Sequence, residues 1–126
     1  MTDDEALNQV AMLNEIFSKK PWLYIDVVEC SPHAVVLDCG IDLTVGPDIE
    51  VRFESVFLVF LLMAWKTDTS FPVLRLLGGE EGYKLNAQYQ VEIGHHLFSF
   101  QPEYLAEGVR CLIAAKSMSW RHVIRD

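Results

Sequence analysis

The chain shows two hydrophobic periods in succession, and the first is that of a helix. Thr2 and Glu5 have the spacing of a capping box, in which the hydroxyl and the carboxylate each bind a free backbone N–H at a helix start. Apolar residues then recur at helical spacing, at Ala6, Val10, Leu13 and Phe17. Pro21 stops this pattern. We therefore expect a helix over about residues 3–18 that covers a sheet with its apolar stripe.

Beyond Pro21 the hydrophobic period falls to two. Residues 22–30 and 34–42 are rich in β-branched and aromatic side chains, and the intervening Ser-Pro-His at 31–33 is typical of a hairpin turn. In residues 49–54, apolar side chains alternate strictly with charged ones. This alternation predicts an antiparallel sheet with one buried and one solvated face.

The alternation stops at Ser55, and the ten residues from Val56 to Trp65 are all apolar. Both faces of this segment must therefore be covered, by the N-terminal helix, by another sheet layer or by a partner chain. The β preference of its first residues favours a bend or bulge near Ser55 followed by a second strand. A short buried helix is the alternative.

The rest of the chain continues the β pattern. Further strands are predicted at residues 72–77, 87–93, 96–100 and 109–120. The glycine-rich segment 78–82 is interpreted as a flexible acidic turn, because its two acids do not suit a phosphate loop. Residues 102–108 resemble a single helical turn closed by Gly108.

These elements predict an α+β fold, with the N-terminal helix packed on a mainly antiparallel sheet of six to eight strands. The sheet would be a meander, partly curled or sandwich-like, because short turns join the strands and no strand–helix–strand alternation is present. A chain of 126 residues suits one domain, 1–126, with the helix at about 3–18 and the β-rich part at about 22–120.

Negative charge is concentrated in the first half of the chain. Residues 1–54 carry eleven acidic and three basic side chains, whereas the remaining 72 residues carry seven of each, so the whole formal charge of −8 belongs to the first part. This bias disfavours nucleic acid and anionic membranes and favours a basic protein surface as partner, with ordinary solubilising charge as the alternative. The acidic start lacks the features of a secretory signal, and the apolar run is too short to span a membrane. We expect a cytoplasmic protein.

The acids of the predicted strands are the candidate binding residues. They are Asp26, Glu29, Asp38, Asp42, Glu50 and Glu54. A three-residue loop in the first hairpin would place Cys30 opposite Ala34 and Asp26 opposite Asp38, with facing β-carbons about 5 Å apart. Two facing carboxylates repel each other, and such a pair can share a proton or hold a cation.

Motifs for a cofactor, a metal or catalysis are weak. The three cysteines have no paired C-x-x-C spacing, and the neighbours His95 and His96 would point to opposite faces of a strand. No nucleophile elbow of the type G-x-S-x-G occurs. We therefore predict no cofactor and no metal, and a non-catalytic role is favoured over an enzyme.

The segment VRFESV, Val51–Val56, with the apolar run after it and the terminal SMSW, Ser117–Trp120, resembles a pattern found in small β-rich bacterial proteins, including immunity proteins of polymorphic toxin systems. The resemblance implies a stoichiometric inhibitor without catalytic residues. Our first hypothesis is therefore a protein-binding module, immunity-like, whose acidic region covers a basic partner.

Two alternatives stay open. One is a secretion-chaperone-like homodimer that binds an extended client. Its interface would come from the apolar run, at Phe57, Val59, Phe60, Leu62 and Trp65. The other is a small-ligand or enzymatic barrel. Its lining would include Tyr24, Tyr89, His96 and Asp38.

Overall fold

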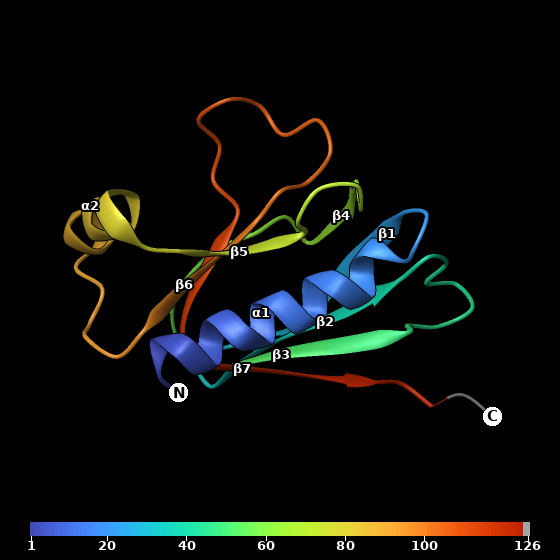
Figure 1. The fold of residues 1–126 in the computed structure, drawn as a ribbon, viewed down its shortest axis with the longest axis horizontal. Helices are drawn as coiled ribbons and strands as arrows, with labels where there is room; N and C mark the ends of the chain where they lie inside the picture. Colours follow the sequence, from blue (N-terminus) through green and yellow to red (C-terminus); the bar gives the residue numbers. More distant parts are fainter. Residues whose placement is uncertain (125–126) are drawn as a thin grey trace.

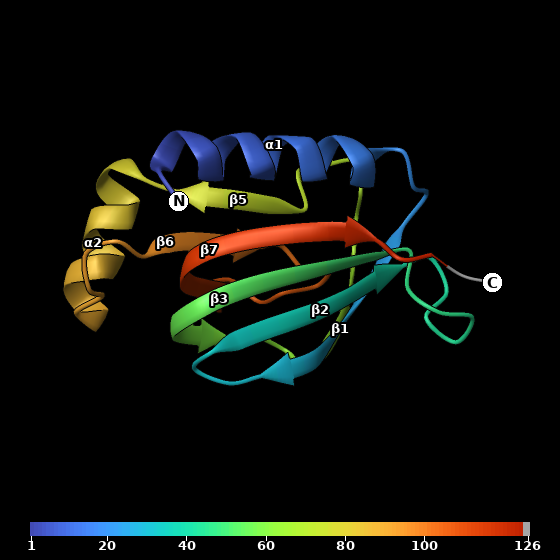
Figure 2. The same cartoon turned by 90° about the horizontal axis from the view of Figure 1, so that it is seen from below.

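The computed structural model describes residues 1–124, which form two helices and one seven-stranded sheet. The elements are α1 (Asp3–Ser18), β1 (Leu23–Cys30), β2 (Ala34–Gly40), β3 (Ile49–Phe60), β4 (Ala64–Thr67), β5 (Leu74–Leu77), α2 (Gly79–Tyr89), β6 (His96–Phe100) and β7 (Leu112–His122). Every strand pair is antiparallel, and the sheet is curled into a half-barrel with α1 lying along β5 (Figures 1 and 2). The predicted α+β class and strand number are confirmed.

Helix α1 forms where the sequence predicts it. Thr2 Oγ1 accepts a hydrogen bond from Glu5 N at 3.1 Å, and Thr2 N donates to Glu5 Oε1 at 3.2 Å, so the capping box is complete. The side chain of Asn14 then pairs with both backbone polar groups of Leu74, at 2.6 and 3.1 Å. This amide satisfies part of the open edge of β5 and fixes the helix to it.

The strand order is β4-β1-β2-β3-β7-β6-β5. Strands β1 to β3 form the predicted meander, but the chain then returns to place β4 beside β1 before it reaches β5 at the opposite edge. The side chain of Trp65 in β4 contacts Phe100 at the end of β6, with ring centroids 5.5 Å apart. The curl therefore brings the two ends of the sheet onto one core.

The register of the first hairpin was predicted correctly at its centre and wrongly at its tip. Asp26 lies opposite Asp38, as expected, but Cys30 lies opposite Val35 and not Ala34. A bulge between Val27 and Glu29 adds one residue to β1, and this shifts the pairing only on the side of the turn.

The expected distortion near Ser55 is present inside a continuous β3. Ser55 has φ of 55°, in the left-handed region, and the pairing of β3 with β7 shifts between Val56 and Leu58. The apolar run is divided among the end of β3, a short turn and the start of β4, so no buried helix forms there.

The second half of β3 is covered on both faces, which explains the change of pattern at Ser55. Val59 packs on the inner core, which also contains the buried residues of α1. Leu58 and Phe60 point the other way, into a separate cluster with Leu85 and Tyr89 of α2. The rings of Phe60 and Tyr89 lie 5.2 Å apart. Helix α2 is therefore the layer that covers the outer face of this apolar segment.

Three local predictions were wrong. Residues 79–82 and 87–89 belong to α2 instead of a turn and a strand, because Gly82, Leu85 and Tyr89 fall on one helical face and Glu80 and Glu81 favour the helix N-terminus. The alternation of apolar and polar residues over 87–93, which predicted a strand, thus spans the C-terminal end of α2 and the residues that follow it. Residues 102–108 form turns without a helix, since Tyr104 has φ of 58° and Gly108 has φ of 82°.

The left-handed conformation of Ser55 gives a stability prediction. Ser55→Gly should raise the free energy of unfolding by about 0.5–1 kcal/mol, because glycine adopts positive φ without a Cβ clash. Ser117→Gly, in the regular part of β7, should instead lower it by about 0.5–1 kcal/mol. Urea unfolding measures both changes. An equal loss of unfolding free energy in the two variants would contradict the left-handed conformation of Ser55.

Candidate functional site

The polar side of the sheet carries a row of charged residues across four strands. Asp26 of β1 faces Asp38 of β2, Asp38 faces Glu50 of β3, and Glu50 faces Arg121 of β7. Facing β-carbons in such a ladder lie about 5 Å apart. Three carboxylates are therefore adjacent in one line, with a single guanidinium at its end. We call these four residues the charged row.

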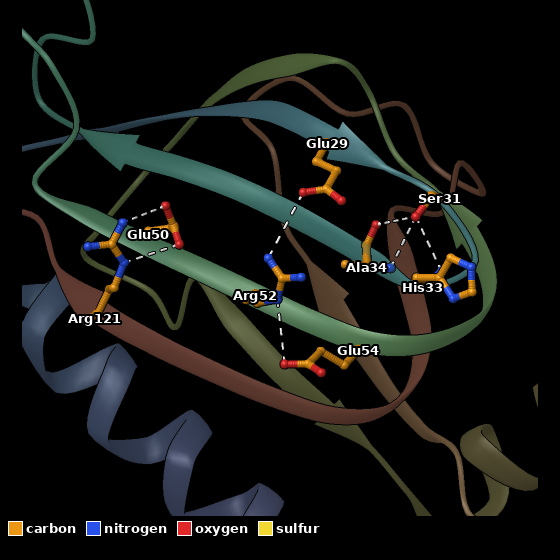
Figure 3. Close-up of polar contacts among 8 residues, drawn as sticks. All are labelled: Glu29, Ser31, His33, Ala34, Glu50, Arg52, Glu54 and Arg121. Carbon is orange, nitrogen blue, oxygen red and sulfur yellow. Dashed lines mark hydrogen bonds and ion pairs between the residues drawn. The ribbon is translucent and has the colours of Figure 1, made fainter.

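The charged row is unevenly neutralised. Arg121 binds Glu50 through two hydrogen bonds, from Nε to Oε1 at 3.2 Å and from Nη2 to Oε2 at 3.1 Å (Figure 3). Neither Asp26 nor Asp38 forms an ion pair with any cation among residues 1–124. Partial burial, followed by the charges of Glu50 and Asp26, raises the pKa of Asp38 above its ordinary value, and Arg121 opposes this rise.

A second charged group lies beside the row. Arg52 of β3 lies between two carboxylates, with Nη1 4.0 Å from Glu29 Oε2 and Nε 3.5 Å from Glu54 Oε1 (Figure 3). The nearby hairpin turn is shaped by Ser31, whose hydroxyl accepts hydrogen bonds from the backbone N–H groups of His33 and Ala34 at 3.2 Å each. Glu29 and Glu54 are thus locally balanced, unlike Asp26 and Asp38.

Asp42 lies outside the ladder, in the loop after β2. Its carboxylate accepts hydrogen bonds from the hydroxyl of Thr44 at 2.6 Å and from its backbone N–H at 3.0 Å. These hydrogen bonds lower the pKa of Asp42 and keep it ionised. Asp42 nevertheless lines a surface hollow of about 490 Å³ together with Asp26, Trp22 and Tyr24. The loop therefore brings Asp42 back towards β1.

Sequence reasoning identified the acids but not their neighbours. Arg52 and Arg121 were missed as partners of the acids, because the pairing of β3 with β7 joins residues far apart in the chain. Trp22 and Tyr24 were missed as surface groups. Their signal was present, because Trp22, which directly precedes β1, alternates with Tyr24 and Asp26, and alternate residues of an extended chain share one face.

The five residues of the predicted dimer interface are divided by the fold. Trp65 is buried in the core, and Val59 and Phe60 are half-buried against residues of the same chain. Only Phe57 and Leu62 are exposed, at 39% and 46%. An interface made from all five side chains together is therefore not available on the surface.

The groups proposed for a ligand-binding barrel do not converge. Tyr24 and Asp38 lie on the polar side of β1 and β2, whereas Tyr89 of α2 packs against Phe60 of β3. His96 is held by α1, with Nδ1 3.0 Å from Asp3 Oδ1 and Nε2 2.9 Å from the carbonyl oxygen of Met1. The hollow of about 820 Å³ beside His96 contains none of the other three groups.

The thiols and possible metal ligands are dispersed. Burial raises the pKa of Cys111 to about 11 and raises that of the fully buried Cys39 as well, so both stay protonated near neutral pH. Cys30, unlike these two, is exposed. Within residues 1–124, no cluster of three or more His, Cys, Asp or Glu side chains has a geometry that could hold a metal ion.

No model of a known protein family matches this chain, and comparisons with curated protein sequences and with solved structures find no significant match. No helix in the described part of the chain has the length and apolar character needed to span a membrane.

The facing carboxylates predict opposite effects of two neutralising substitutions. Because its pKa is raised by folding, ionised Asp38 weakens the folded state above that pKa, and the penalty disappears as the pH falls below the ordinary aspartate range. Asp38→Asn should therefore raise the free energy of unfolding at pH 7 by about 0.2–1 kcal/mol, with a smaller gain at pH 3.

Asp42→Ala is the matched control with the opposite sign. The lowered pKa of Asp42 means that its carboxylate stabilises the fold above its ordinary pKa and loses this effect as the pH falls through the lowered value. The variant should be less stable than the wild type at pH 7, with a smaller difference at pH 3. Urea unfolding at both pH values measures the two effects. A lower free energy of unfolding for Asp38→Asn than for the wild type at pH 7 would refute the repulsion between Asp26 and Asp38.

Proposed function

We propose that this protein is a non-catalytic protein-binding module whose polar sheet face binds a basic surface of another protein. The observation that carries this proposal is the facing pair Asp26 and Asp38, two carboxylates without an ion-pairing cation among residues 1–124. Like charges directly opposite each other destabilise a free sheet. A cation from a partner would convert this repulsion into attraction.

The surface around the pair supports the same function. Helix α2 and its cluster cover the polar side only beyond Ser55, and Asp26, Asp38 and Glu50 remain partly accessible on the ladder of β1, β2 and the first half of β3. The net charge of −8 would attract a basic protein from a distance and orient its approach. Glu29, Glu54 and Arg52 would form the rim, where charged groups set orientation more than affinity.

An immunity-like inhibitor is the specific form of this proposal. The resemblance of Val51–Val56 and Ser117–Trp120 to immunity proteins implies stoichiometric binding, and these two segments pair with each other around the charged row. The buried, protonated thiols of Cys39 and Cys111 give no support to a thiol nucleophile. A secretion-chaperone-like dimer has less support, because Trp65 lies in the core.

The proposal is tested by affinity capture from an extract of the source organism, with immobilised wild-type protein and two variants of equal net charge. Asp26→Asn/Asp38→Asn removes the facing pair, whereas Asp4→Asn/Glu15→Gln removes two exposed charges from α1. We expect the wild type and the α1 variant to retain the same basic protein and the row variant to bind it about tenfold or more weakly. Retention should fall as NaCl is raised.

Two outcomes would contradict the proposal. One is equal retention by both variants, which would show that general charge and not the facing pair attracts the partner. The other is retention that does not change with salt. Circular dichroism of both variants checks that the fold is intact.

A further inference from the structure

A surface hollow at the start of β1 combines aromatic rings with carboxylates. Its volume is about 490 Å³. Trp22, Tyr24 and Asp26 line one side, and loop residues 41–44, which include Asp42, line the other. The hollow borders the charged row through Asp26, which belongs to both.

The aromatic side of the hollow is held in place. Trp22 Nε1 donates a hydrogen bond to the carbonyl oxygen of Ile41 at 2.9 Å, which fixes the indole against the loop. Tyr24 lies in β1, paired with Gly40 on one side and Lys66 on the other. Both rings nevertheless remain accessible, with Trp22 42% and Tyr24 41% exposed. Rigid aromatic side chains that remain half-exposed are typical anchors of protein interfaces.

A cation of the chain itself already occupies the faces of these rings. Lys66 Nζ lies 5.7 Å from the centroid of Trp22 and 5.7 Å from that of Tyr24. Within residues 1–124 this ammonium forms no ion pair with a carboxylate, so the two rings are its main partners. The pair of rings can therefore hold a positive charge. Lys66 belongs to β4 and is not among the residues that line the hollow, so its ammonium covers the rings from outside the hollow.

The two carboxylates of the hollow, Asp26 and Asp42, form no ion pair with a cation among residues 1–124. In the described part of the chain, Asp26 forms no ion pair, and the hydrogen bonds to Asp42 come from neutral groups of Thr44 and the loop backbone. A second cation entering between the rings and these two carboxylates would meet attraction from both sides. The positive charge of Lys66 would oppose it.

We propose that this hollow binds the guanidinium group of an arginine side chain supplied by the partner protein. Arginine suits the site better than lysine or a quaternary ammonium, because its planar group stacks on aromatic rings and donates hydrogen bonds to carboxylates at the same time. Lys66 does not line the hollow and would oppose the guanidinium through its charge. This assignment rests on the proposed binding of a basic protein and names the side chain that is recognised.

The test uses a blocked tripeptide, acetyl-Gly-Arg-Gly-amide, and the indole N–H signal of Trp22 in NMR spectra of the ¹⁵N-labelled protein. The control peptide carries citrulline, which has nearly the shape of arginine but no charge. We expect a saturable shift of the Trp22 signal with the arginine peptide and a much weaker response to citrulline.

Variants separate the aromatic site from general charge attraction. Trp22→Leu and Tyr24→Leu should each weaken binding by about two- to fivefold or more, since each removes one aromatic ring from the lining of the hollow. Lys66→Thr should strengthen binding by about two- to fivefold, because it removes the competing cation. Tyr83→Leu, at an exposed aromatic residue of α2 away from the hollow, should leave affinity unchanged. Because Trp22→Leu lacks the indole N–H, peptide binding to this variant is followed by the shift of a backbone amide signal in residues 41–44.

The proposal is overturned if the wild-type protein shows no saturable shift, if citrulline binds as well as arginine, or if Lys66→Thr weakens binding. Failure here is distinct from failure of the proposed function. Capture of a basic protein through Asp26 and Asp38 without peptide binding would refute only the arginine assignment. Peptide binding without such capture would leave the arginine site standing and refute the wider proposal.

Discussion

The register of the ladder β1-β2-β3-β7 is the constraint on which the rest of the structure depends. Side chains alternate between the two faces of a strand, so a slip of one residue would exchange the core for the surface on every strand involved. In the observed register, Ile25, Leu37 and Phe53 lie in the core. The same register places Asp26, Asp38, Glu50 and Arg121 side by side on the other face. Burial of the apolar set therefore forces the like charges together.

Strand β3 links this ladder to the second half of the molecule. Its first half has a polar outer face, and its second half has an apolar one that α2 covers. The left-handed Ser55 and the bulge before Leu58 lie where this change occurs. Since α1 and α2 cover opposite faces, the polar face is left open only before Ser55. The position of α2 thereby determines which part of the sheet can meet a partner.

The sequence predicted the local features and missed those that depend on distant contacts. The capping box of α1 and the opposition of Asp26 to Asp38 were predictable because each depends on residues close in the chain. The pairing of Glu50 with Arg121 was not, because it spans 71 residues. Helix α2 was missed because its apolar stripe is short and the alternation after Ala87 is also compatible with a strand. The aromatic residues beside Asp26 were visible in the alternation, but Trp22 was assigned to the strand alone and Tyr24 was considered only as barrel lining.

The central claim is that the register sets Asp26, Asp38 and Glu50 in one row, and carboxyl titration followed by ¹³C NMR tests it most directly. The account predicts that Asp38 titrates above the ordinary aspartate range and Asp42 below it. It also predicts that Asp26→Asn lowers the midpoint of Asp38, because a facing charge has been removed. An Asp38 midpoint at or below that of Asp42, unaffected by Asp26→Asn, would contradict the register and the binding face derived from it.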